Sequence, residues 1–344
     1  MSSERTASWW MWALGAGAAG ALTLAAWVWA SNASVARART AGTGEDGAAR
    51  MHGSAGAIDA AGGALRAAEE YAKRGELGTA RTILEAGIGK FPDDQAMRLS
   101  LARVLVQVGE RARAYEQFEA ALAIGPREGE LEFQAGVLAA GLGRDDRAIE
   151  HFGAAQATDP GRAEYPLYLG LSQVRLGDAG AARKNLMLAA RLDESLATAW
   201  GSLAELSLRE NEARVALQMI ERARELEPDV TAWRVIEARA LKRVGEVEGA
   251  LMVLMGIPEA ERGAGAVLRL IGECYGALGR PGDAAATYAS FAARNPDNGE
   301  LLFETAQWFE RAGDRVRATE FAERAAALGF EGAGALAERL LSQE

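Results

Sequence analysis

Residues 216–228 read ALQMIERARELEP and combine small residues, large apolar residues and a closing proline at fixed spacings. The same arrangement recurs along most of the chain. Steps of 34 residues in either direction from Ala216 always reach another alanine, which gives Ala80, Ala114, Ala148, Ala182, Ala216, Ala250, Ala284 and Ala318. A fixed period of this length is typical of a stacked array of repeated units. The period therefore predicts a repeat protein before any single helix is assigned.

Each repeated block is expected to form two helices. With the shared alanine taken as residue 20 of its block, the eighth residue is always Ala or Gly, and small residues let two helix axes approach closely. The fifteenth residue is glycine in seven blocks and Asn211 in the fifth, and both types tolerate the left-handed conformation that ends a helix. Helix A should end there. Helix B should follow and, in seven of eight blocks, bury a large apolar residue four positions after the alanine.

This pattern resembles the tetratricopeptide repeat family, which has small residues at positions 8, 20 and 27 of a 34-residue unit and a closing proline. That proline is present as Pro92, Pro126, Pro160, Pro228 and Pro296. The resemblance covers residues 61–332 and implies an all-α, right-handed superhelical solenoid of eight helix-turn-helix repeats. Residues 333–344 would add a capping helix over the last repeat. Ile257 and Phe291 replace the small residue at position 27, so we expect irregular stacking at 251–265.

The amino-terminal part of the chain follows another pattern. Residues 9–30 carry no charged side chain, and a helix of this length can cross a bilayer core of roughly 30 Å. Tryptophans stand near both ends, where indole rings favour the membrane interface. We predict a short tail at 1–8, one transmembrane helix at 9–30 and a flexible linker at 31–60. A signal peptide cleaved after Ala30 is the alternative.

The charges around the anchor leave the side of the membrane open. Arg5 precedes the apolar segment, whereas Arg37 and Arg39 follow it. Counting arginines slightly favours a cytoplasmic array. However, a signal anchor or a cleaved signal would place the array outside, and anchored repeat proteins that resemble this one are commonly periplasmic. We therefore expect a single-pass membrane protein with a periplasmic array.

Composition argues against several classes of function. The net charge is −10, and an acidic array is a poor nucleic-acid binder because phosphate contacts need clustered Lys and Arg. Cys274 is the only cysteine, and we expect it to be a buried apolar residue. Neither His52 nor His151 stands in a context for metal binding or nucleophilic catalysis. We expect no catalytic residue, cofactor, metal site or small-molecule substrate.

A groove for partner proteins is predicted from the resemblance. In the family, the concave surface is lined by positions 2, 5, 9, 12 and 13 of helix A. Here those positions carry an apolar band in the second to fourth blocks and an arginine ladder in later blocks, interrupted by Ala277. The predicted groove residues are Leu99, Val106, Phe133, Val137, Leu167, Leu171, Val174, Arg175, Arg209, Arg243 and Arg311. Such a surface fits a peptide with apolar and acidic groups.

The alternative to a groove is that the apolar residues pack between blocks and the arginines pair with nearby acids, such as Glu205. With the groove, the sequence predicts a membrane-tethered scaffold that binds protein or peptide partners on the concave face of the array. A second possible function is a holdase-like chaperone, which would bind many unfolded segments weakly through the apolar band. The carboxylate-clamp pattern of Lys and Asn found in some members of the family is not evident at the ninth positions.

Overall fold

The computed structural model describes residues 54–342, and every regular element in this part of the chain is an α-helix. The chain divides into two compact units, Met1–Leu192 and Asp193–Glu344, which we describe separately. The helices described in the first unit are α4 (Ser54–Lys73), α5 (Leu77–Lys90), α6 (Gln95–Gln107), α7 (Arg111–Ile124), α8 (Gly129–Gly141), α9 (Asp145–Thr158), α10 (Glu164–Leu176) and α11 (Ala179–Leu192). The second unit contains α12 (Ala197–Arg209), α13 (Ala213–Leu226), α14 (Thr231–Val244), α15 (Val247–Met255), α16 (Glu259–Arg262), α17 (Gly265–Ala277), α18 (Pro281–Arg294), α19 (Gly299–Arg311), α20 (Arg315–Ala327) and α21 (Ala333–Leu341).

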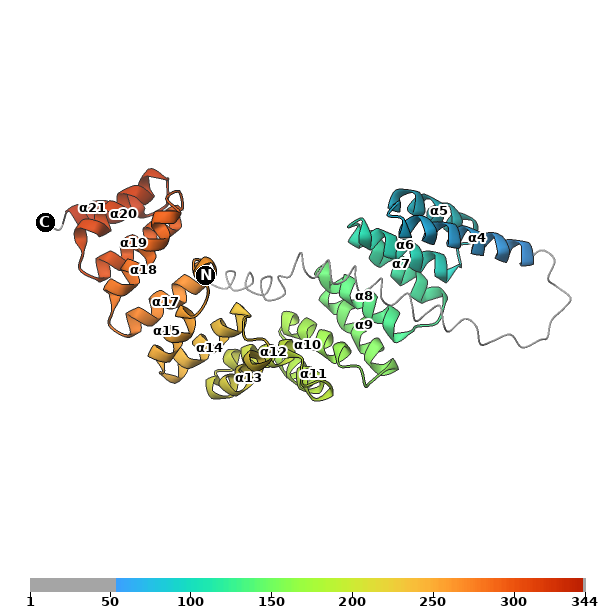
Figure 1. The fold of residues 1–344 in the computed structure, drawn as a ribbon, viewed down its shortest axis with the longest axis horizontal. Coiled ribbons are helices and arrows are strands. Elements are labelled where there is room, and N and C mark those ends of the chain that lie inside the picture. The colour runs from blue at the N-terminus through green and yellow to red at the C-terminus, as the bar shows by residue number, and fades with distance from the viewer. Residues whose placement is uncertain (1–53, 343–344) are drawn as a thin grey trace. The chain divides into compact units, whose positions relative to one another are not determined.

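The helices alternate as the 34-residue period predicts, and they can be followed by label and colour in Figure 1. Helix A of the second block begins at Gln95 and helix A of the eighth begins at Gly299, the predicted starts of these blocks. A short turn joins the two helices of a block, so they pack as antiparallel neighbours.

The fifteenth residue of every block is left-handed, as predicted. The backbone angle φ ranges from 67° at Gly279 to 94° at Gly245 among the seven glycines, and it is 63° at Asn211. The residue that follows donates its N–H to a carbonyl five residues earlier, as Glu246 does to Leu241 at 2.9 Å. This bond satisfies a carbonyl that the end of helix A would otherwise leave free.

The shared alanine and the small eighth residue are contact points between helices. All eight alanines at position 20 have no exposed surface. A Cβ atom added at Gly136, an eighth residue, would lie 2.6 Å from Phe152. Phe152 is itself fully buried and is the predicted large residue of helix B in that block. The packing therefore confirms the 34-residue register.

Each unit contains apolar clusters that run through consecutive blocks. In the first unit a cluster extends from Ala61 to Leu169. In the second unit one cluster includes Ile220 and Trp233, and a larger one extends from Val235 to Leu340. Because each block buries its apolar side chains against the next, stability arises mainly between neighbours. The last helix, α21, contributes Leu336 and Leu340 and occupies the range expected for the capping helix.

Two segments differ from a regular array. α4 begins at Ser54 rather than at residue 61, so the expected linker is helical over its last residues; alanine, frequent there, is the strongest helix former. In the sixth block α15 has 9 residues, whereas α13 has 14. Pro258 lacks the N–H needed to extend α15, and the short helix α16 follows it. This is the irregularity expected at 251–265.

The predicted tail (1–8), the transmembrane helix (9–30) and the linker up to residue 53 lie outside the described residues. Among the helices that the structure describes, none combines the length and apolar character needed to cross a membrane. The anchor therefore stays a prediction from the sequence.

Candidate partner-binding surface

The predicted apolar band lies within the first unit, and most of it is closed. Its buried members, which are 5–7% exposed, are Phe133, Leu167, Leu171 and Val174. Its half-buried members, which pack against the main cluster of this unit, are Leu99, Val106 and Val137. The packing alternative therefore describes the buried positions better than an open groove does.

Phe133 shows why the band is closed. Its ring centroid lies 5.6 Å from that of Phe152 on helix B of the same block. The centroids of Tyr165 and Tyr168, both on α10 of the next block, lie 5.2 and 5.1 Å away. Aromatic rings thus occupy the space that a ligand would need.

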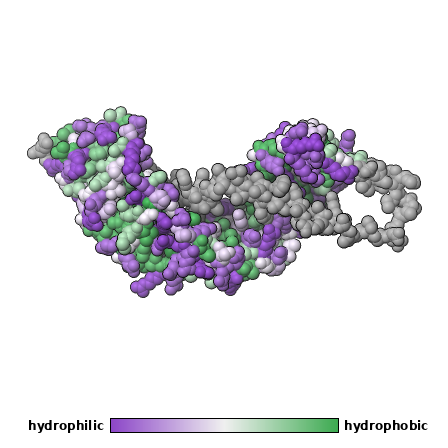
Figure 2. Space-filling view, in the orientation of Figure 1, coloured by the Kyte–Doolittle hydropathy of each residue, from purple (hydrophilic) through white to green (hydrophobic). Residues whose placement is uncertain are grey.

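A holdase would need a continuous exposed apolar surface. The buried band does not supply one, and on the face seen in Figure 2 hydrophobic residues lie among hydrophilic ones. No observation on the described residues favours the holdase over the scaffold.

Two arginines of the predicted ladder are held by acidic neighbours. In the first unit, Nη2 of Arg175 lies 2.5 Å from Oδ1 of Asp145 and donates to the hydroxyl of Ser172 at 3.0 Å. In the second unit, Nε of Arg209 lies 3.7 Å from Oε1 of Glu205. Pairing of Arg209 with Glu205 is the alternative that the sequence suggested.

The two remaining arginines differ from each other. Arg243 donates to the backbone carbonyl of Leu208. Arg311 instead stacks over an aromatic ring, with its guanidinium carbon 4.6 Å from the ring centroid of Trp308. Within the described residues Arg311 forms no ion pair, so its charge is available to a ligand.

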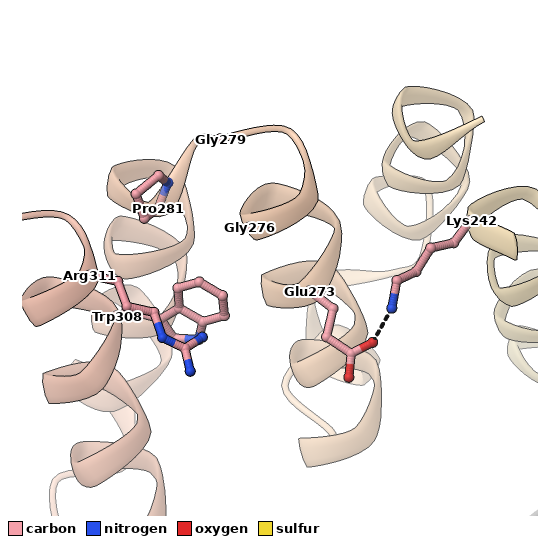
Figure 3. A pocket seen from close by; sticks show the side chains of 7 residues that line it. All are labelled: Lys242, Glu273, Gly276, Gly279, Pro281, Trp308 and Arg311. Carbon is pink, nitrogen blue, oxygen red and sulfur yellow. Dashed lines mark hydrogen bonds and ion pairs between the residues drawn. The ribbon is translucent and has the colours of Figure 1, made fainter. Parts of the chain in front are cut away.

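An open cavity of about 690 Å³ lies beside Arg311, within the second unit (Figure 3). Its lining residues are Lys242, Glu273, Gly276, Gly279, Pro281, Trp308 and Arg311. They come from α14, α17, the turn before α18, the first residue of α18, and α19. Lys242, Glu273 and Arg311 are residues 12, 9 and 13 of their blocks. The resemblance assigns these positions to the concave surface.

Glycines on α17 make room for the indole that borders this cavity. A Cβ at Gly272 would lie 2.9 Å from Trp308, and one at Gly276 would lie 3.1 Å from it, so the indole packs directly on the helix backbone. Position 13 of this block is Ala277, where the neighbouring blocks have Arg243 and Arg311. The short side chains leave a hollow that the next block's Trp308 borders.

Among the described residues, one positive charge on the walls of the cavity has no acidic partner. Lys242 pairs with Glu273 on the wall opposite Trp308, as the dashed line in Figure 3 shows. Arg311 covers the indole face on the other wall. A stacked guanidinium keeps its N–H edge free, and this edge matches the two oxygens of a carboxylate. The cavity can therefore accept an acidic group on a chain whose own net charge is −10.

Arg311 is the predicted groove residue that the structure places at the cavity, whereas Lys242, Glu273 and Trp308 were not predicted. The sequence does contain a signal for them. Positions 12 and 13 of helix A in the seventh block are Gly276 and Ala277, and helix A of the next block carries Trp308. Small side chains beside a large one in the neighbouring block indicate a hollow.

Cys274 adjoins this wall and is fully buried, as expected from the sequence. Burial raises the pKa of its thiol, which disfavours the reactive thiolate. In the part of the chain that the structure describes, no group of three or more His, Cys, Asp or Glu side chains is placed to hold a metal ion.

Comparison with known proteins agrees with the fold. No profile of a known protein family matches the sequence, and no curated protein matches it. Among solved structures, a tetratricopeptide repeat protein from Parabacteroides merdae has a TM-score of 0.53 and 13% identity, and the match covers 72% of this chain and 98% of that chain. PilF from Pseudomonas aeruginosa has a TM-score of 0.51 and 19% identity, with 63% of this chain and 99% of that chain covered. The described residues therefore form an all-helical repeat array with the fold of tetratricopeptide repeat proteins.

Proposed function

We propose that this protein is a membrane-tethered scaffold that holds a partner protein through a segment bound on the helix A surface of the second unit. The observation that carries the proposal is the cavity beside Trp308, where Arg311 is stacked and has no acidic partner within the described residues. Helical repeat arrays commonly offer such extended surfaces to other proteins, which supports a scaffold.

The chemistry of the cavity defines the segment that fits it. An acidic side chain would receive two N–H groups from the guanidinium of Arg311, while an apolar neighbour would lie along Pro281. The ion pair of Lys242 and Glu273 on the opposite wall gives the segment a polar boundary. We therefore propose a partner segment that carries Asp or Glu next to an apolar residue.

The tether rests on the sequence alone. Residues 9–30 are uncharged and long enough to span a bilayer, and the segment up to residue 53 would let the array move relative to the membrane. In this proposal the anchor brings the bound partner to the bilayer surface, on the periplasmic side.

Binding of fluorescent peptides to the full chain in detergent tests the cavity. Peptides with a central Glu next to Leu are compared with peptides of the same sequence in which Gln replaces Glu. An ion pair that is exposed to solvent contributes about 0.2–1 kcal/mol, so Kd should rise by up to about fivefold with Gln. Added salt should weaken binding of the Glu peptides, because the pair is exposed to solvent.

The Arg311→Ala variant should lose this discrimination between Glu and Gln peptides. Arg324→Ala is the matched control, since Arg324 also stacks on an aromatic ring of the second unit, 4.8 Å from the centroid of Phe321, but does not line the cavity. Unchanged discrimination in Arg311→Ala would rule out the cavity as the binding site.

The scaffold and the tether are tested in cells by crosslinking followed by purification of the full chain. One stoichiometric partner supports the scaffold, whereas a broad mixture of clients would support a holdase. Protease added to spheroplasts should cut the array if it is periplasmic, and protection would place it in the cytoplasm.

A further inference from the structure

A buried polar cluster lies in the first unit, between the helices of the second and third blocks, and the proposed scaffold function does not use it. Its centre is His151 on α9, which is 4% exposed. Nδ1 of His151 lies 2.8 Å from Oε2 of Glu132 on α8. Nε2 lies 3.0 Å from Oε1 of Glu119 and 3.3 Å from the hydroxyl of Tyr115, both on α7. Both ring nitrogens therefore face groups on neighbouring helices.

The bond to Glu132 decides which nitrogen always carries a proton. Burial would raise the pKa of Glu132, but the bonds from Arg127 and His151 outweigh it and hold the pKa below its usual range. An ionised carboxylate only accepts hydrogen bonds, so Nδ1 must be the donor. The proton that His151 can gain or lose is therefore the one on Nε2.

Nε2 has two partners that suit its two protonation states. A protonated Nε2 donates to the carboxylate of Glu119. An unprotonated Nε2 accepts from the hydroxyl of Tyr115, which keeps its proton because burial, with Glu119 nearby, raises the pKa of this tyrosine. The two rings already stand at 81° to each other with centroids 5.9 Å apart, an edge-on arrangement that brings the hydroxyl to Nε2.

We propose that the proton on Nε2 of His151 is a switch that ties α9 either to Glu119 or to Tyr115 of α7. In the protonated state the tie is charge-assisted and therefore stronger than the neutral bond to Tyr115. The proton leaves to water past Glu119, which is only partly buried.

Two arginines contact the two alternative partners of Nε2. Arg147 pairs with Glu119 at 3.3 Å, so this carboxylate keeps a partner when Nε2 releases it. Arg144 stacks over Tyr115 at 5.2 Å. Neither arginine contacts His151 directly: Arg147 holds Glu119 and Arg144 holds Tyr115. The seam between the second and third blocks would therefore be tighter with Nε2 protonated than with Nε2 unprotonated.

Nuclear magnetic resonance of the full chain with ¹⁵N-labelled histidine tests the switch. On raising the pH, Nε2 of His151 should move from the chemical shift of a protonated nitrogen to that of an unprotonated one, while Nδ1 stays protonated. The His151→Gln variant identifies the signal against that of His52. Loss of the proton from Nδ1, or no titration of Nε2 between pH 5 and 9, would overturn the proposal.

Two variants separate the two states. Tyr115→Phe removes the partner of the unprotonated state, so the midpoint of the Nε2 titration should rise by about half to one pH unit. Glu119→Gln removes the partner of the protonated state, so the midpoint should fall by a similar amount. A midpoint that shifts in the same direction in both variants, or that shifts in neither, would contradict the switch. The titration of the unmodified chain provides the test should either variant fail to fold.

Discussion

Phe133 in the first unit and Trp308 in the second are both buried aromatic residues on helix A, 5% and 8% exposed, but only Trp308 lines an open cavity. Tyr165 and Tyr168 of the following block close the space around Phe133. The indole of Trp308 packs on glycines of the preceding block and under Arg311, and an open cavity lies beside it. Small residues in the adjacent block thus accompany a cavity beside the buried ring, and aromatic residues in the adjacent block accompany a filled surface.

The largest expected effect tests the closed side of this comparison. Phe133→Ala removes a ring that is 5% exposed and contacts three other rings, so it should lower the free energy of unfolding of the first unit by about 3–5 kcal/mol. Urea denaturation followed by circular dichroism measures the loss. Val137 on the same helix is half-buried, so Val137→Ala should cost clearly less. Equal costs would mean that Phe133 is packed no better than Val137.

Glu132 in the first unit and Glu304 in the second have pKa values shifted in opposite directions. Glu132→Gln in the first unit leaves Arg127 and His151 without their charged acceptor and should cost about 1.5–3 kcal/mol at pH 7. The folded-state pKa of Glu132 lies below the unfolded value, so its stabilisation is present above about pH 4.3 and is lost as the pH falls through the folded pKa. The variant's cost should therefore disappear in acid.

Glu304 in the second unit should behave in the opposite way. Burial raises its pKa more than Arg269 lowers it, so ionisation above about pH 4.3 destabilises the folded state. Glu304→Gln should then stabilise the protein slightly at pH 7 and have no effect in acid. Melting curves of both variants at pH 7 and pH 3 give the comparison. Destabilisation by Glu304→Gln at pH 7 would contradict the predicted sign.

Adding one methyl group compares the space in the two regions. In Gly136→Ala the new Cβ would lie 2.6 Å from the buried ring of Phe152, so overpacking should cost about 1–3 kcal/mol. In Gly276→Ala the nearest atom, on the edge of Trp308, is 3.1 Å away and can yield toward the cavity. The better helix propensity of alanine offsets this contact, so we expect a net change within about 1 kcal/mol. Thermal unfolding of the two variants measures the difference, and a larger loss at Gly276 would reverse the comparison.

The smallest effects concern two arginines at position 13 of their blocks. Arg175→Ala removes the ion pair with Asp145 and the bond to Ser172, and it should cost about 1 kcal/mol without changing peptide binding. Arg311→Ala removes only the stacking on Trp308 and should cost about 0.5 kcal/mol. Chemical denaturation and the peptide assay together separate a structural arginine from a binding one. Loss of peptide binding in Arg175→Ala would mean that the first unit also contributes to the site.

The array could be predicted from the sequence because its determinants are local and repeated. The left-handed residue at position 15 and the buried alanine at position 20 act within one block. The sequence therefore predicted the left-handed conformation of Asn211 as well as that of the seven glycines. The start of α4 was misplaced because the Ala-rich stretch before residue 61 resembles a linker in composition but is helical in the structure.

The site could not be predicted to the same degree, because exposure depends on contacts across blocks. Leu167 and Phe133 stand at positions that face a partner in the family that the sequence resembles, yet neighbouring aromatic rings bury Phe133, and Leu167 is only 6% exposed. The periodic pattern assigns a position to each residue but not the volume of the side chains opposite it. Trp308 and Arg311 become a site only with Gly276 one block earlier.

The single buried cysteine gives the protein a built-in reporter. Cys274 lies on α17 between Glu273 and Gly276, which line the cavity, and its thiol can meet an alkylating reagent only when this helix separates from its neighbours. With one thiol in the chain, the alkylation rate at a given pH reports how often local or global opening exposes this helix. A segment bound on the wall of α17 should slow the reaction, so occupancy of the surface could be timed without adding any label.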